Sequence, residues 1–458
     1  FQGDTIWTKS FGGVEDDSGY SVEQTSDGGY IVAGSVYNSF VYNSKDVYLL
    51  KTDVNGIEQW SQKFGDPEKT DEGYSVQQTS DGGYIICGSL MNDFFTAEMC
   101  LIKTNNLGSI MWTETFSGYG EGRSVQQTTD GGFIIVGTLG TKLHLVKTNN
   151  IGAEQWKKTF LGTNASQSFG YSVRQTTDGG YITAGQQYYP VGTSSYDVYL
   201  IKTDGSGTEQ WTKTFGGTGY DNAWSVQQTT DLGYIIAGGT GSFGDTINGD
   251  VYLIKTDEDG IEQWSKTYGG NAEETGWSVQ QTNDGGYVIT GWNGGLGSNE
   301  KDVYLIKTDG NGDSLWTKTF GGTDIDWSFS VQQTTDLGYI IAGGTTSFGD
   351  GTYLIKTDIN GIEQWSKTFA SGLFLSVQQT TDLGYIVAGY TYPQDYDVLL
   401  IKTDGNGNIT STFNIPINPN RKLEKVVDIL GRETKPKTNT PFIEIYDDGT
   451  VEKRIVIE

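Results

Sequence analysis

The chain has 458 residues and a formal charge of −27, from 57 acidic and 30 basic side chains. Such an acidic surface repels phosphate backbones and anionic lipids, which excludes nucleic acid and membrane surfaces as expected partners. No apolar run reaches the length of about 18 residues that membrane insertion needs. Glycine is abundant (66), proline is scarce (7) and 13% of residues are aromatic, as expected for many short strands joined by tight turns.

One block of residues recurs along the chain. A Ser-Val-x-Gln-Thr run marks each copy, and the eight runs begin at Ser21, Ser75, Ser124, Ser172, Ser225, Ser278, Ser330 and Ser376. A tryptophan also recurs near the end of each block, at Trp7, Trp60, Trp112, Trp156, Trp211, Trp264, Trp316 and Trp365. A fixed period of about fifty residues is typical of repeat architectures, in which a unit buries its apolar face only against its neighbours.

Each block contains four strand-like runs, which in the fifth block are Ser225–Thr229, Tyr234–Gly238, Asp250–Thr256 and Gln263–Tyr268. Val, Ile, Tyr and Trp dominate these runs, and no helical period of 3.6 appears. Asp-Gly-Gly or Asp-Leu-Gly joins the first run to the second, and Asp-x-x-Gly joins the third to the fourth, as hairpins require. Four-stranded antiparallel units repeated radially form a β-propeller. The sequence therefore predicts an all-β, eight-bladed propeller over residues 1–413, with no helix longer than one or two turns.

The first strand run indicates how the ring closes. Thr5–Phe11 is a fourth-strand run with no block before it, whereas Ile409–Phe413 occupies the same place after the eighth block but lacks the tryptophan. We expect the N-terminal strand to complete the last blade. The segment Asp-x-x-Gly-x-x-x-Trp resembles the tryptophan-docking motif of eight-bladed quinoprotein dehydrogenases, which implies an indole wedged between neighbouring blades. Their adjacent cysteine pair has no counterpart here, so no quinone cofactor is expected.

The pattern changes after the propeller. Residues 414–421 are expected to form a linker, and residues 422–458 a small C-terminal β domain with three strand runs. This segment resembles the C-terminal sorting domains of the type IX secretion system of Bacteroidetes, although family members are commonly longer. The residues that carry the resemblance are Asp428, Gly431, Arg432, Asp448, Gly449 and Lys453. The resemblance implies that the secretion machinery is a partner and that the protein is exported across the outer membrane.

The propeller blocks resemble the repeats of bacterial cell-surface and secreted β-propeller proteins. This resemblance implies a secreted or cell-surface location. The start Phe1-Gln2-Gly3 is compatible with cleavage of a signal peptide or with a tag remnant.

Side chains suited to catalysis are few. His144 is the single histidine and replaces the tyrosine of Val-Tyr-Leu-Ile-Lys, so we interpret it as a core or edge residue rather than a general base. A zinc site or a Cys/His pair is therefore not expected. Cys87 and Cys100 lie on consecutive predicted strands, either as small core residues or as a cross-strand disulfide. The sequence predicts that the protein is not an enzyme.

Paired carboxylates leave one enzymatic alternative open. They are Asp16 with Asp17, Asp71 with Glu72, Glu273 with Glu274, and Asp324 with Asp326, all before Ser-Val-x-Gln-Thr runs. Two carboxylates about 5–10 Å apart catalyse glycoside hydrolysis, so the alternative is a secreted glycan-active hydrolase. Ca²⁺ would take the same oxygen ligands. Solvated acidic loops explain these residues too, and we expect no cofactor.

Binding residues are expected on one face of the ring. Connections in an antiparallel blade alternate between its two ends, so the short uniform turns share one face and the variable loops share the other. The residue before each Ser-Val-x-Gln-Thr run is mostly aromatic, and this series either rings the channel mouth or packs between blades. Trp292 is assigned to a long variable loop. The candidate binding residues are Tyr20, Tyr74, Tyr171, Trp224, Trp277 and Trp292. The predicted function is a non-enzymatic binding or adhesion module for an extracellular glycan or protein.

Overall fold

The computed structural model describes residues 7–12, 16–37, 44–94, 96–190, 195–244, 249–294, 300–391, 396–409, 423–428, 432, 434–435, 442–446 and 451–454. The chain divides into two compact units, Phe1–Ile409 and Thr410–Glu458. The ordered structure in these ranges is strand, turn and bend, and they contain no helix of the length and hydropathy needed to cross a membrane.

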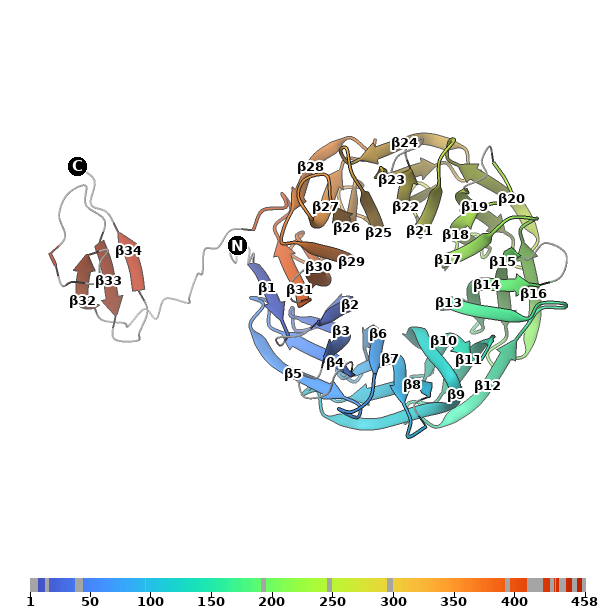
Figure 1. Ribbon diagram of the computed structural model, residues 1–458, viewed down its shortest axis with the longest axis horizontal. Coiled ribbons are helices and arrows are strands. Elements are labelled where there is room, and N and C mark those ends of the chain that lie inside the picture. The colour runs from blue at the N-terminus through green and yellow to red at the C-terminus, as the bar shows by residue number, and fades with distance from the viewer. Residues whose placement is uncertain are drawn as a thin grey trace. The chain divides into compact units, whose positions relative to one another are not determined.

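The first unit is a closed ring of eight four-stranded antiparallel blades (Figure 1). We number the blades I to VIII in chain order and the strands of each blade from the channel outwards. Six blades are separate sheets, while blades II and III share the long strand β9 (Ile110–Gln127). This arrangement confirms the predicted eight-bladed propeller. The prediction succeeded because each block of the sequence repeats the same four strands.

The strands occupy equivalent positions in every blade. The innermost strands are β2 (Ser18–Gln24), β6 (Glu72–Gln78), the second half of β9, β13 (Gln167–Gln175), β17 (Asp221–Gln228), β21 (Glu274–Gln281), β25 (Asp326–Gln333) and β29 (Gly372–Gln379). The second strands are β3 (Tyr30–Tyr37), β7 (Tyr84–Met91), β10 (Phe133–Leu139), β14 (Tyr181–Tyr189), β18 (Tyr234–Thr240), β22 (Tyr287–Gly294), β26 (Tyr339–Thr345) and β30 (Tyr385–Thr391). The third strands are β4 (Lys45–Thr52), β8 (Ala97–Thr104), β11 (Lys142–Thr148), β15 (Ser195–Thr203), β19 (Asp250–Thr256), β23 (Lys301–Thr308), β27 (Gly351–Thr357) and β31 (Val398–Thr403). The outer strands are β5 (Glu58–Phe64), the first half of β9, β12 (Glu154–Phe160), β16 (Glu209–Phe215), β20 (Glu262–Tyr268), β24 (Ser314–Phe320), β28 (Glu363–Thr368) and β1 (Trp7–Phe11).

The N-terminal strand closes the ring, as expected. β1 pairs antiparallel with β31 of blade VIII, from Trp7 opposite Lys402 to Phe11 opposite Val398. Side-chain hydrogen bonds also join blade VIII to blade I. For example, the Gln24 N–H donates to Gln378 Oε1 at 2.8 Å. The first and last parts of the ring are therefore held together by backbone pairing and by side chains.

The hydrophobic core lies between blades rather than within one. Each of eight buried clusters combines residues of two adjacent blades; Val32 and Leu50 of blade I, for example, pack with Ile386 of blade VIII. A tryptophan on each outer strand extends this contact onto the next blade. The Trp264 ring packs against Gly312 of the next blade, so closely that a Cβ on this glycine would lie 2.6 Å from the ring. All eight repeats share this arrangement. The indole therefore wedges between blades, as the docking motif implies.

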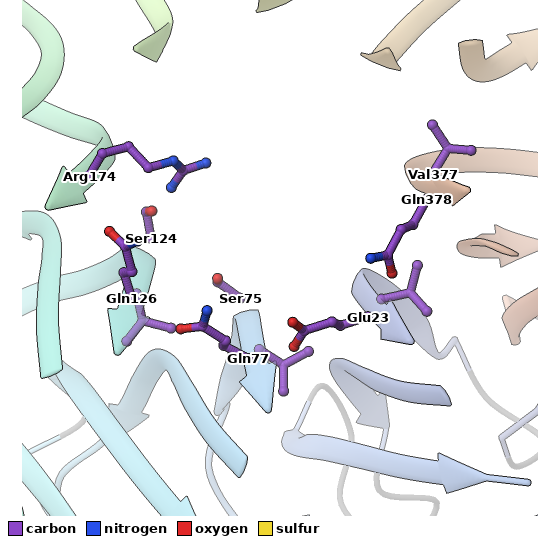
Figure 2. A pocket seen from close by; sticks show the side chains of 11 residues that line it. Glu23, Ser75, Gln77, Ser124, Gln126, Arg174, Val377 and Gln378 are labelled. Carbon is purple, nitrogen blue, oxygen red and sulfur yellow. The ribbon is translucent and has the colours of Figure 1, made fainter. Parts of the chain in front are cut away.

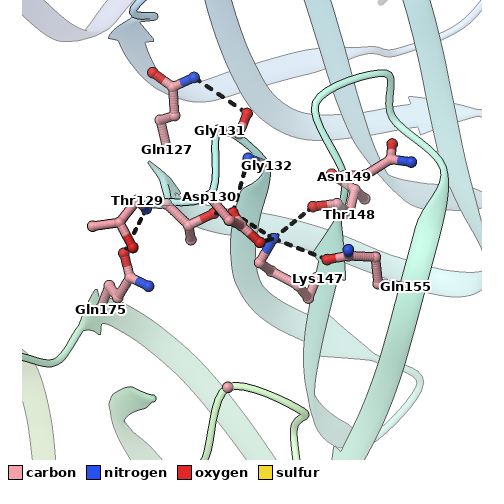
Figure 3. A network of polar contacts seen from close by, with 12 residues as sticks. Gln127, Thr129, Asp130, Gly131, Gly132, Lys147, Thr148, Asn149, Gln155 and Gln175 are labelled. Carbon is pink, nitrogen blue, oxygen red and sulfur yellow. Dashed lines mark hydrogen bonds and ion pairs between the residues drawn. The ribbon is translucent and has the colours of Figure 1, made fainter. Parts of the chain in front are cut away.

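Buried lysines tie the two hairpins of each blade together (Figure 3). Lys147 Nζ donates to Asp130 Oδ2 at 2.9 Å, to the Thr148 carbonyl at 2.8 Å and to Gln155 Oε1 at 3.0 Å. Partial burial raises the pKa of Asp130, but hydrogen bonds from Thr128, Lys147 and the Gly132 N–H outweigh it and hold the pKa at about 2. The other pairs are Lys51–Asp27, Lys103–Asp81, Lys202–Asp178, Lys255–Asp231, Lys307–Asp284, Lys356–Asp336 and Lys402–Asp382.

Glutamines at the ends of the innermost strands bond to the hairpin turns of neighbouring blades. The Gln that precedes Thr in each Ser-Val-x-Gln-Thr run accepts a backbone N–H from the hairpin of the preceding blade, as Gln175 Oε1 does from Thr129 at 2.8 Å (Figure 3). This bond occurs in all eight blades. Each of these side-chain amides therefore links its blade to the hairpin of the preceding blade.

The second unit is a three-stranded antiparallel sheet. Its strands are β32 (Leu423–Asp428), β33 (Phe442–Tyr446) and β34 (Val451–Arg454), in that order. Asp428 ends β32, Arg432 is exposed and Lys453 lies opposite Ile443. Gly431, Asp448 and Gly449 lie outside the described residues.

The two cysteines are separate core residues. Cys87 and Cys100 are buried and free, and they belong to different inter-blade clusters. Cys87 lies opposite Leu101 and Cys100 opposite Gly88, so their side chains leave opposite faces of the sheet. The disulfide alternative is therefore wrong. His144 is 3% exposed, and burial lowers its pKa to about 4, so it stays neutral as a core residue.

Candidate functional site

The two ends of the channel differ in what surrounds them. We call the end that carries the short Asp-Gly hairpins the turn face, and the end that carries the longer connections the loop face. The residue before each Ser-Val-x-Gln-Thr run lies toward the loop face. We call these eight residues the rim: Tyr20, Tyr74, Arg123, Tyr171, Trp224, Trp277, Phe329 and Leu375.

A β-bulge places every rim residue. The pairing of the innermost strand with the second strand skips this one residue in each blade, for example between Ala223 and Ser225. The same irregularity occurs in the other seven blades. An extra residue in one strand bends it and redirects a side chain, which is why bulges are frequent beside functional sites. Opposite each bulge lies a glycine such as Gly238, where a Cβ would overlap the Asn222 carbonyl.

The rim side chains contact one another across blade boundaries. Trp224 and Trp277 are stacked, with ring centroids 4.4 Å apart and an interplanar angle of 19°. Tyr171 continues this arc on one side (4.6 Å to Trp224) and Phe329 on the other (5.2 Å to Trp277). All these side chains are half-buried. The rings therefore pack between blades while part of each remains open to solvent.

A shorter arc completes the other side of the rim. The Tyr20 and Tyr74 centroids are 5.4 Å apart, and the Arg123 guanidinium lies 4.3 Å from the Tyr74 centroid. Arg123 also forms an ion pair with Glu121. Burial raises the pKa of Tyr74, and neighbouring Glu72 raises it further, so this phenol stays neutral. The candidates Tyr20, Tyr74, Tyr171, Trp224 and Trp277 thus all lie in the rim.

Trp292 joins the rim from the second strand of its blade. It lies in β22, opposite Thr275 and Val303, so its assignment to a loop is wrong. The β22–β23 ladder continues beyond the length that the sequence pattern indicates, and this carries Trp292 into regular pairing. Its centroid is 5.6 Å from Trp277, and Lys301 Nζ lies 4.7 Å from its ring.

The indoles of Trp277 and Trp292 expose carbon rather than nitrogen. Both side chains are half-buried, yet both Nε1 atoms are buried and lack a hydrogen-bond partner among the described residues. The surface that solvent reaches on these two residues is therefore apolar. Flat apolar ring surface contributes about 0.5–1.5 kcal/mol per contact when another ring stacks on it.

A tyrosine cluster that the sequence interpretation missed adjoins the Tyr171 end of the rim. Tyr196 lies 4.7 Å from Tyr220 and 4.9 Å from Tyr188, between ring centroids. Tyr220 is 51% exposed. Tyr196 and Tyr220 come from the third strand of blade IV and from the loop before β17, so no local motif groups them.

The channel contains a polar cavity of about 420 Å³ (Figure 2). The x residues of the Ser-Val-x-Gln-Thr runs line it, including Glu23, Gln77, Gln126, Arg174 and Gln378. In seven of the eight blades, the side chain at position x accepts the backbone N–H of the Gln that precedes Thr in the next blade. The donor–acceptor distances are 2.6 to 2.8 Å. Arg174 is the exception, because a guanidinium has no acceptor.

Arg174 projects into this cavity (Figure 2). The Arg174 side chain is exposed to the channel, whose walls surround it. The surrounding protein lowers the pKa of the guanidinium by desolvation. An arginine nevertheless remains charged at any physiological pH. Burial raises the pKa of Glu23, which lines the same cavity. The sequence signal was present, since Arg174 is the one basic residue at the x position.

The structure separates the members of the carboxylate pairs on the loop face. Asp17, Asp71, Glu274 and Asp326 are each at most 2% exposed and lie between blades. Asp16, Glu273 and Asp324 are exposed, and Glu72 pairs with Lys45 at 3.1 Å. Glycoside hydrolysis needs two carboxylates that reach one substrate. One member of each pair is covered by protein instead.

Comparisons with known proteins identify the fold. No protein-family model matches the chain, and no curated protein matches it either. Among solved structures, Sqt1 from Chaetomium thermophilum is similar over 87% of this chain and 99% of its own, with 10% identity and a TM-score of 0.57. The Dos1 propeller is similar over 87% and 95%, with 11% identity and a TM-score of 0.56. At such identities the likeness shows a shared β-propeller fold alone.

Proposed function

We propose that this chain is a non-enzymatic binding module that receives an extracellular glycan on the rim. The observation that carries the proposal is the arc of half-exposed rings from Tyr171 through Trp224 and Trp277 to Phe329, each placed by a bulge. Sugar rings present C–H faces that stack on flat aromatic surface. The acidic ring surface favours neutral or cationic ligands over anionic ones.

Binding to a polysaccharide panel, followed by tryptophan fluorescence, tests this function. Replacing Trp224 or Trp277 by Ala should weaken the affinity about 3- to 10-fold for any glycan bound, which corresponds to one lost stacking contact. Trp264→Ala is the matched control, because it removes the same side chain from a docking position on an outer strand. It should lower the melting temperature and leave the affinity of the folded molecules unchanged.

Three results would contradict the proposal. Rim variants that lower the melting temperature but bind as tightly as the parent protein would assign the rim to inter-blade packing. Release of reducing sugars, lost in Asp324→Asn or Glu274→Gln, would instead identify a hydrolase. Binding to proteins but to no glycan would replace the ligand class.

We also propose that the protein is exported by type IX secretion and is secreted or held at the cell surface. The resemblance of residues 422–458 to sorting domains supports this, as does their separation from the ring as a compact unit. Deleting Lys422–Glu458 should leave the propeller inside a Bacteroidetes host, while the deletion protein keeps the strand-rich circular dichroism of the ring. Secretion of the truncated chain at the parental level would refute the assignment.

A further inference from the structure

Carboxylates of neighbouring blades meet in pairs on the loop face. One comes from the start of an innermost strand and the other from the start of the third strand in the preceding blade. Both oxygens approach the glycine that follows the outer strand. A Cβ at Gly216 would lie under 3.0 Å from Asp197 Oδ1 and Asp221 Oδ2, and one at Gly321 equally close to Asp302 and Asp326.

The same three residues recur at five of the eight blade boundaries. The glycines are Gly12, Gly65, Gly216, Gly269 and Gly321, and the carboxylate pairs are Asp397–Asp17, Asp46–Asp71, Asp197–Asp221, Asp250–Glu274 and Asp302–Asp326. At the other three boundaries, Ser117, Leu161 and Ala370 replace the glycine, and no acidic pair remains. The innermost-strand position there holds Gly120, Ser168 and Gly372. The glycine and the innermost-strand acid thus change together, whereas the third-strand position keeps an acid, Glu98, at one of these three boundaries.

Burial leaves some of these oxygens without a partner. Glu274 is 2% exposed, and its Oε2, the atom that faces Gly269, has no hydrogen-bond partner in the described part of the chain. The Glu274 carboxyl group does interact with the Gly270 N–H and with the Asp250 carboxyl group, and burial together with Asp250 raises its pKa to about 7. Asp197 Oδ1, the atom that faces Gly216, also lacks a hydrogen-bond partner in this part of the chain. At Gly321 the facing atom is Asp326 Oδ2, which accepts Ser347 Oγ at 2.6 Å and the Gly322 N–H at 3.0 Å. A buried ionised carboxylate is costly unless a cation or a proton compensates it.

Among the described residues, no basic side chain forms an ion pair with Asp197, Asp221, Asp302 or Asp326. Burial and the Asp326 carboxylate raise the pKa of Asp302, as burial and Asp221 raise that of Asp197 to about 6. Each pair therefore concentrates negative charge at a position that only glycine leaves free of a side chain. Hydroxyl groups place further oxygen atoms beside the pair, since Thr240 Oγ1 and Ser242 Oγ both donate hydrogen bonds to Asp221.

We propose that these inter-blade cradles, each formed by a glycine and two carboxylates, bind Ca²⁺. Oxygen ligands with irregular geometry suit Ca²⁺, which accepts six to eight of them and completes its shell with water, better than Mg²⁺, which demands an octahedron. The absence of histidine and cysteine from the cradles disfavours zinc. Each acid precedes an aromatic rim residue by three positions, so a bound ion also fixes the strand that carries the rim.

Calcium titration of the full chain tests the proposal. After EDTA treatment, CaCl₂ should raise the melting temperature saturably, with a Kd on the order of 10⁻⁴–10⁻³ M, as in extracellular calcium modules. Calorimetry should count no more than five equivalents. MgCl₂ and NaCl at the same ionic strength should raise the melting temperature less.

Single amide substitutions locate the ions. Asp326→Asn and, at a separate boundary, Asp197→Asn should each remove one equivalent of Ca²⁺. Without calcium both variants should melt at or above the parent temperature, because the new amide donates to the facing carboxylate. Asp324→Asn is the matched control, since this exposed carboxylate lies two residues from Asp326 and should leave the count unchanged.

The alternative is that each pair shares a proton. In that case CaCl₂ would match NaCl, no calcium would bind, and Asp326→Asn would raise the melting temperature equally in both salts. That combination would overturn the calcium sites. An unchanged calcium count in both Asp326→Asn and Asp197→Asn would overturn their location. Neither result depends on whether the rim binds a glycan.

Discussion

The turn face and the loop face of the ring differ in how strictly the blades repeat. On the turn face, every blade has the buried Lys–Asp pair, the glutamine that receives a neighbouring hairpin and the glycine that accepts a tryptophan. On the loop face, the connections vary, the carboxylate pairs occur at five boundaries and the rim combines six aromatic residues with Arg123 and Leu375. The Lys–Asp pair holds each blade together and the other two contacts fix it to its neighbours, so every blade needs them. The loop-face residues are not needed to assemble the ring, so they can vary from blade to blade.

The largest expected effect comes from acid, which acts on all the Lys–Asp pairs together. Hydrogen bonds and Lys lower the pKa of these aspartates in the folded ring, to about 2 for Asp130 and Asp178. A lowered folded pKa stabilises the protein above the unfolded value near 4, and this contribution is lost as the pH falls from about 4 to about 2. Thermal unfolding followed by circular dichroism should show the steepest loss of stability in that interval. A flat profile there would contradict the role of the pairs.

Breaking one pair should cost less. In Lys307→Met the Thr308 carbonyl and Asp284 lose a donor that lies 2.7 Å and 3.0 Å away, and the lysine side chain is 2% exposed. We expect a loss of about 2 kcal/mol in urea unfolding, since Asp284 is half-exposed and regains water. Lys266→Met, at the exposed pair with Asp313, should cost under about 0.5 kcal/mol. Equal losses would remove the distinction between buried and surface pairs.

Two glycine substitutions separate tryptophan docking from backbone strain. Gly312 and Gly285 both have positive φ, +77° and +82°, but only Gly312 faces a tryptophan, whereas nothing lies within 4 Å of a Cβ at Gly285. Gly285→Ala should therefore cost about 1 kcal/mol, from the backbone alone. Gly312→Ala should cost a further 1 kcal/mol or so, because Trp264 must move. The difference in unfolding free energy measures the docking contact.

The smallest expected effect is a gain of stability in the channel. Arg174→Gln supplies the acceptor that the Gln228 N–H lacks from this position, and so completes the ring of seven bonds. We expect an increase of about 0.5–1.5 kcal/mol in unfolding free energy. Gln280→Arg makes the reverse change at a position where the side chain accepts Gln333 N–H at 2.6 Å, and should destabilise the ring. A neutral Arg174→Gln together with a neutral Gln280→Arg would show that these bonds contribute nothing measurable.

The prediction of the fold succeeded because its signals are local and are repeated eight times. Alternating apolar residues mark strands such as β18, Asp-Gly turns mark hairpins, and the unmatched strand that contains Trp7 marks the closure. The docking glycines follow from the same spacing. The buried lysines also left a signal, since Lys147 and its equivalents interrupt otherwise apolar strands in every block.

The tertiary structure alone decided how the candidate site is built. A bulge changes the direction of Trp224 by one skipped pairing, which a sequence of alternating residues does not reveal. Trp292 lies in a strand because the neighbouring strand β23 continues to pair with it. Asp302 and Asp326 belong to different blades and meet only when these two blades pack together. The sequence specifies each blade through contacts within the repeat, whereas the rim, the channel and the carboxylate cradles arise between blades and exist only in the assembled ring.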